Sequence, residues 1–127
     1  MQTKCPASIS ALKFKDHQLL AGGEWGGLHT WDLRSPSQQP AESRLFDSSN
    51  VSRILVTSND IWIGTGSGAI YQWDPTSTVS SAAVQLISDH EPIYGLACRA
   101  ESNTILAASR RGILREFKLD QLAAVRQ

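Results

Sequence analysis

Short apolar runs, separated by polar turns, recur at a regular interval along the 127-residue chain. Residues 9–14, 51–56 and 93–98 each begin a unit, and their starts are 42 residues apart. Their partial alternation of apolar and polar positions predicts β-strands with one buried face. In each unit a second apolar run follows a polar turn, at residues 19–21, 61–63 and 105–107, and a third run ends at an aromatic residue, Trp31, Trp73 or Phe117.

A glycine stands five positions before each of these aromatic residues, at Gly26, Gly68 and Gly112. Glycine adopts backbone conformations that a side chain hinders, so it favours a tight turn between two antiparallel strands. The aromatic residues are 42 and 44 residues apart, because the polar turn at residues 99–103 is two residues longer than its counterparts. A recurrence at this interval predicts a repeat protein.

A fourth and weaker apolar run closes each unit, and we expect it to be a strand as well. The sequence therefore predicts an all-β protein with four short strands in about 42 residues. A short helix is the alternative for residues 120–127, but the position of this segment in the repeat favours a strand. We expect one domain over residues 1–127, with units at about residues 8–47, 50–88 and 92–127, whose fourth runs are residues 44–46, 83–87 and 122–125.

The repeats resemble the WD40 family. The closing pair Trp-Asp is present at Trp31-Asp32 and Trp73-Asp74, whereas the third unit has Phe117-Lys118. The resemblance covers residues 8–127 and implies that each unit is a four-stranded blade of a β-propeller. It also implies that the three closing aromatic residues belong to the core.

The repeats also depart from the WD40 pattern. The Gly-His pair that usually precedes a blade is reduced to Asp89-His90, and we interpret His90 as a residue that caps a blade. The aspartate usual before the turn glycine is replaced in every unit. We therefore expect the histidine–serine/threonine–tryptophan–aspartate hydrogen-bond network of the family to be incomplete in each blade. The replacing residues are Trp25, Ser67 and Arg111.

Three blades leave two open ends, whereas family members usually have six to eight blades in a closed ring. Exposed sheet edges and half-covered apolar faces favour association. Three interpretations therefore stay open. The chain is a segment of a larger propeller, it pairs with itself to form six blades, or another protein completes the ring.

Composition narrows the functional classes. Apolar residues at 41% and charged residues at 19% are typical of a globular protein, and no apolar run is long enough for a transmembrane helix or a signal peptide. A net charge of zero argues against nucleic-acid binding, although the last third of the chain is mildly basic. Cys5 and Cys98 lack the spacing of metal ligands, so we expect free thiols inside the cell, in the cytosol or nucleus.

Nothing in the sequence has the setting of a catalytic or cofactor site. The run Gly64–Gly68 resembles a phosphate-binding loop or a nucleophile turn, but a strand follows it where those sites need a helix. His17, His29 and His90 are too scattered for a metal site. We therefore expect no enzyme activity, no metal and no cofactor.

The WD40 resemblance places the turns between second and third strands on one rim, where partner proteins often dock. The rim then carries Trp25, Arg110 and Arg111, and tryptophan and arginine are enriched among interface hot spots. We predict these three residues as partner contacts, with Trp25 first; the alternative is that Trp25 packs over a loop of its own chain. Their expected neighbours on the rim are Ser48, Ser49, Asn50, Ser67, Glu91 and Pro92.

A second motif indicates a more specific function. Trp31-Asp32-Leu33-Arg34 matches the W-D-x-R ending of WD40 proteins that recruit substrates to cullin-type ubiquitin ligases through the damage-binding adaptor, although Trp25 and Thr30 depart from the longer pattern. The sequence thus predicts a non-catalytic protein-interaction scaffold in an intracellular multiprotein complex. The alternative is a ubiquitin-ligase substrate receptor that uses Arg34.

Overall fold

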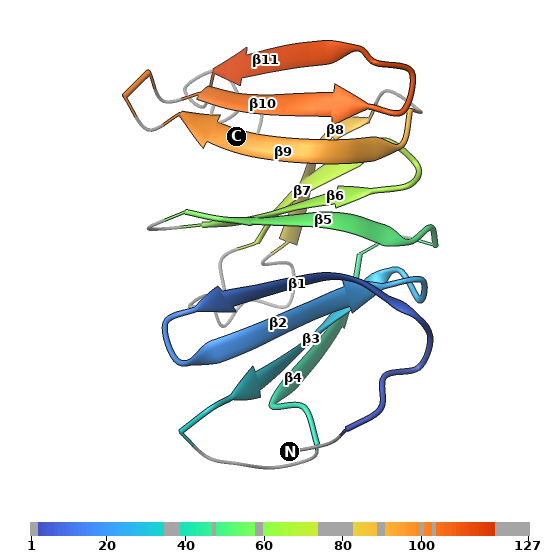
Figure 1. The fold of residues 1–127 in the computed structure, drawn as a ribbon, viewed down its shortest axis with the longest axis vertical. Coiled ribbons are helices and arrows are strands. Elements are labelled where there is room, and N and C mark those ends of the chain that lie inside the picture. The colour runs from blue at the N-terminus through green and yellow to red at the C-terminus, as the bar shows by residue number, and fades with distance from the viewer. Residues whose placement is uncertain are drawn as a thin grey trace.

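The structure is a computed structural model, and it describes residues 3–34, 39–46, 48–57, 60–73, 83–88, 91–99, 101–102 and 104–118. These residues form three antiparallel sheets joined by turns, and no helix is present among them. In Figure 1 the sheets are stacked along the long axis of the molecule, with β5 between β1 and β9. The expectation of an all-β chain is confirmed for the described residues.

Each sheet follows chain order, as the repeat predicts. The first sheet has the order β1 (Ile9–Lys15), β2 (Gln18–Gly23), β3 (Gly27–Asp32) and β4 (Glu42–Leu45). The second has the order β5 (Val51–Val56), β6 (Ile61–Thr65), β7 (Ala69–Trp73) and β8 (Ala83–Ser88). The third has β10 (Thr104–Ser109) between β9 (Ile93–Arg99) and β11 (Leu114–Lys118).

The prediction of four strands in every unit is therefore met in the first and second sheets only, because the third sheet has three strands among the described residues. The strand predicted at residues 122–125, and the helix alternative for residues 120–127, lie outside the described residues. The fourth strand of the first unit begins earlier than predicted, at Glu42 instead of Arg44. Backbone pairing of Thr30 with Glu42 extends this strand into polar residues, which an apolar pattern does not reveal.

The three turn glycines have the left-handed backbone conformation that the sequence predicts. Their φ values are 79°, 88° and 83° at Gly26, Gly68 and Gly112. Each turn is closed by a backbone hydrogen bond from the glycine N–H to the carbonyl oxygen three residues earlier, at 3.0, 3.2 and 3.1 Å. A side chain at these positions would strain the backbone.

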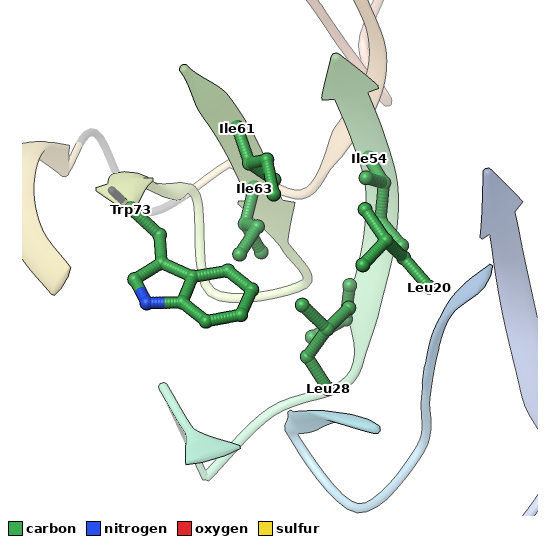
Figure 2. Packing of buried hydrophobic residues seen from close by; sticks show 7 residues of the cluster. Leu20, Leu28, Ile54, Ile61, Ile63 and Trp73 are labelled. Carbon is green, nitrogen blue, oxygen red and sulfur yellow. The ribbon is translucent and has the colours of Figure 1, made fainter. Parts of the chain in front are cut away.

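The main core lies between the first and second sheets. Figure 2 shows Leu20 and Leu28 of the first sheet pointing toward Ile54 and Trp73 of the second. A second cluster joins the second and third sheets, where Trp62 is buried and Phe117 packs against it. Two of the three closing aromatic residues are core residues as predicted, with 4% of Trp31 and 1% of Trp73 exposed, whereas Phe117 is half-buried.

A side chain that fits against a glycine joins each pair of neighbouring sheets. A Cβ atom placed on Gly22 would lie 2.5 Å from Cγ1 of Val51, and one on Gly64 would lie 2.6 Å from Cγ2 of Ile93. Only a residue without a side chain permits these approaches. Burying a side chain of this size stabilises the fold by about 1.5–3 kcal/mol.

A serine hydroxyl ties the same sheets together. Ser10 Oγ donates to the carbonyl oxygen of Val51, and Ser52 Oγ donates to that of Ile93. The donor and acceptor are 41 residues apart in both cases. The junction between neighbouring sheets thus has two parts. An apolar side chain packs over a glycine of the preceding sheet, and a serine hydroxyl of that sheet donates a hydrogen bond to the backbone carbonyl of the same apolar residue.

In the first sheet the closing tryptophan lacks the side-chain hydrogen bond that the WD40 resemblance implies, which fits the incomplete network expected from the sequence. Within the described part of the chain, Trp31 Nε1 and Thr30 Oγ1 are buried and lack a hydrogen-bond partner. An unpaired buried polar group costs about 1–3 kcal/mol. His90, interpreted above as a capping residue, lies outside the described residues.

Candidate interaction surfaces

The turns between second and third strands lie on one edge of the stack, at the right of Figure 1. Each is bonded to the segment that leads into its own sheet. Glu24 N–H donates to the Ser8 carbonyl at 2.9 Å, Gly66 N–H to the Asn50 carbonyl at 2.9 Å, and Arg110 N–H to the Pro92 carbonyl at 3.1 Å. We call this side of the molecule the turn edge.

Arg110 and Arg111 stand at the end of the turn edge that belongs to the third sheet, and both are exposed. The Nε atom of Arg111 lies 3.2 Å from Oε1 of Glu91, and 77% of the arginine side chain is exposed. An ion pair this open to water contributes little to stability. The guanidinium groups therefore remain accessible to a partner, as their predicted role requires.

Trp25 also belongs to the turn edge by its backbone, but its side chain is half-buried against its own sheet. The indole ring stacks on the His29 ring, with centroids 5.1 Å apart and planes 30° apart. It also packs against a cluster of Cys5, Ala21 and Trp31. These contacts fit the alternative that Trp25 packs over its own chain, and its role as a partner contact stays a prediction.

Trp25 covers part of the face of the first sheet that points away from the second sheet, and we call this face the free face. Strand register places Leu12 opposite Ala21 and Phe14 opposite Leu19, on the same face as Trp31. The free face carries several exposed apolar residues that the sequence reading did not single out, namely Ile9, Leu12, Phe14 and Leu45.

Two adjoining grooves open on the free face. The larger, of about 550 Å³, is lined by Cys5, His29 and Trp31 among others, and the smaller, of about 430 Å³, by Trp25, His29 and Leu45. Burial lowers the pKa of His29 and raises the pKa of the Cys5 thiol. A catalytic cysteine instead needs a lowered pKa, so the pair has the character of packed side chains rather than of a nucleophile and its base.

Arg34, the residue of the W-D-x-R motif, is held by the aspartate of the same motif. Its Nε and Nη2 atoms donate to the Asp32 carboxylate at 3.1 and 3.0 Å, and 67% of its side chain is exposed. The hydrogen bonds from Arg34 lower the pKa of Asp32 and raise that of Arg34. The motif therefore presents a fixed guanidinium at the surface, far along the strand from the turn edge.

Other kinds of site lack supporting residues in the described ranges. Among those residues, no three histidine, cysteine or acidic side chains come together as metal ligands would. The described part of the chain also contains no helix of the length and apolar character needed to cross a membrane. Cys5 and Cys98 are free thiols.

Searches against protein-family models and against curated proteins found no match. Solved structures do share the fold. The WD40 β-propeller domain of Doa1 superposes with a TM-score of 0.75 at 14% identity, over 91% of this chain and 39% of that one. The computationally designed Ika8 protein gives a TM-score of 0.74 at 19% identity, over 89% of this chain and 34% of that one.

The computationally designed Ika4 protein is also similar, with a TM-score of 0.62 and 14% identity. The alignment covers 91% of this chain and 93% of Ika4. The present chain thus spans about two fifths of the Doa1 domain, about a third of Ika8 and nearly all of Ika4. At these identities the comparisons show a propeller-like fold, and we refer to the sheets below as blades.

Replacing Trp25 by alanine tests its packing on the free face. We expect the free energy of unfolding to fall by roughly 1–3 kcal/mol, less than the 3–5 kcal/mol of a fully buried tryptophan. Because burial lowers the pKa of His29, this pKa should rise toward its ordinary value when the indole is removed. Urea unfolding and an NMR titration of the His29 ring, each carried out on the wild type and the variant, measure the two effects. An unchanged stability together with an unchanged His29 pKa would contradict the packing role.

Proposed function

We propose that the chain is a non-catalytic protein-interaction scaffold of the WD40 type, working in an intracellular multiprotein complex. The observation that carries this proposal is the repeated backbone hydrogen bond at the turn edge, in which Glu24, Gly66 and Arg110 occupy equivalent positions. The bonds fix three neighbouring turns on a rigid stack of blades. A backbone held in this way loses little conformational freedom on binding, which favours affinity.

The two arginines are the contacts to which we assign partner recognition. Arginine is frequent among interface hot spots because its planar group forms several directed hydrogen bonds. Arg110 and Arg111 lie side by side in a turn whose backbone is fixed, and the nearby Glu91 orients one of them. Such a pair suits an acidic or carbonyl-rich segment of a partner protein.

Several observations support a non-catalytic function inside the cell. The shifted pKa values of Cys5 and His29 follow from burial, and those of Asp32 and Arg34 follow from their mutual ion pair. None of these four shifts is of the kind that prepares a general acid or a general base for catalysis. Two free cysteines are typical of a reducing compartment.

Charge reversal at Arg110 and Arg111 tests the role of the turn edge. The variant carrying both Arg110→Glu and Arg111→Glu should bind partners at least about tenfold more weakly, since one hot-spot residue contributes about 2 kcal/mol or more. The matched control is Arg99→Glu with Lys118→Glu, which changes charge equally at the other end of the same blade. Quantitative affinity capture compares the bound proteins, and circular dichroism checks the fold. An equal loss in both variants would contradict a specific role for the turn edge.

Exposure of Arg34 favours a second candidate, a substrate receptor for a cullin-type ubiquitin ligase. The guanidinium is fixed by Asp32 and remains mostly open to water. If this function holds, the intact chain binds the damage-binding adaptor and Arg34→Ala abolishes the binding, while Arg99→Ala leaves it unchanged. Co-precipitation with purified adaptor provides the measurement. No association of the intact chain would remove this candidate.

A further inference from the structure

The exposed apolar residues of the free face repeat a pattern that is buried elsewhere in the molecule. Ile9 and Leu12 are 48% and 57% exposed. Their counterparts 42 residues later, Val51 and Ile54, are 0% and 3% exposed because the first blade covers them. The free face therefore has the surface of a blade junction that no blade of the described chain covers.

The two junctions inside the chain show what such a face requires of its neighbour. The first residue of the first strand of a blade, which we call its inner strand, lies over a glycine of the preceding blade; this residue is Val51 in β5 and Ile93 in β9. The residue three positions later approaches the same glycine, with Ile54 Cδ1 at 3.4 Å from a Cβ placed on Gly22 and Leu96 Cδ1 at 3.3 Å from one placed on Gly64. A serine of the preceding blade completes each contact, at Ser10 or Ser52.

We propose that the free face binds a propeller blade of a partner polypeptide, one that presents a glycine to Ile9 and a serine hydroxyl to the Ile9 carbonyl. This inference rests on the proposed scaffold function and names one of its docking surfaces. Ile9 and Leu12 supply the side chains that Val51 and Ile54 supply inside the chain. The partner supplies the equivalents of Gly22 and Ser10.

Part of the junction is already filled by the chain itself. At the internal junction Phe46, just after β4, packs on Trp73 and Tyr71, with ring centroids 6.1 and 5.6 Å apart. At the free face Cys5 packs on Trp31, the counterpart of Trp73. Residues near Cys5 thus cover the outer part of the face, and the exposed part next to β1 is where the partner blade docks.

The third blade of a second copy does not match this face. Ala108 stands where Gly22 and Gly64 stand in the other blades, and a Cβ atom at either of those two positions would collide with the side chain of Val51 or Ile93. Tyr94 replaces the serine of Ser10 and Ser52 and is 50% exposed. Glu116 is exposed at the position of the buried Thr30 and Gln72. These three departures favour a different polypeptide over self-association.

Changing the third blade so that it matches the free face tests the proposal. A second copy of the chain then serves as the binding partner. The variant Tyr94→Ser, Ala108→Gly, Glu116→Gln copies Ser52, Gly64 and Gln72 of the second blade. We expect wild type to be a monomer and this variant to associate head to tail, with at least a twofold increase in mass, as a closed pair of copies or a longer assembly. Sedimentation velocity measures the mass, and circular dichroism confirms folding.

Two additional substitutions identify the face. In the associating variant, Ile9→Asp should restore the monomer, whereas Ile9→Val, which keeps a β-branched apolar side chain like that of the counterpart Val51, should leave the assembly unchanged. A wild-type assembly that Ile9→Asp dissociates would overturn the proposal in favour of a second copy. A folded triple variant that stays monomeric would overturn the proposal that a glycine and a serine of the neighbouring blade are what the free face recognises. Both results are independent of the arginine test at the turn edge, because neither requires a partner.

Discussion

The contact between an apolar side chain and a glycine of the neighbouring blade is the constraint on which the rest of the structure depends. Val51 on Gly22 and Ile93 on Gly64 bring the inner strands so close that a single methyl group would collide. This approach sets the spacing at which Leu20, Trp62 and their neighbours meet in the two core clusters. Because protein interiors are close-packed, a change at this contact is transmitted to the whole junction.

The sequence pattern predicts most of this frame, because the information is periodic. The turn glycines, the closing aromatic residues and the three inner strands follow from spacing alone. The orientation of Trp25 does not, since a residue in a turn can point to solvent or fold back, and stacking on His29 depends on tertiary structure. The free face was missed for a related reason: Ile9 and Leu12 read as ordinary half-buried strand positions until the structure shows that nothing in the described chain covers them fully.

The same stack of blades carries two surfaces of different chemical character, the turn edge and the free face. The turn edge is polar, fixed by backbone hydrogen bonds, and ends in two accessible arginines, so it suits directed recognition of a partner segment. The free face is apolar and shaped by the same repeat that builds the core, so it suits burial against another blade. A scaffold needs both properties, a rigid set of contacts and a means of joining a larger assembly.

A double-mutant cycle between Gly22 and Val51 tests the central constraint most directly. Gly22→Ala should destabilise the chain by about 1–3 kcal/mol through overpacking. Combined with Val51→Ala, which opens space at the same point, it should cost at least about 0.5 kcal/mol less than the sum of the single changes. Gly95→Ala, whose added Cβ would meet Ala108 at an ordinary 3.4 Å, is the control and should be tolerated. Urea unfolding that gives additive effects at Gly22 and Val51, or an equal loss at Gly95, would contradict the account.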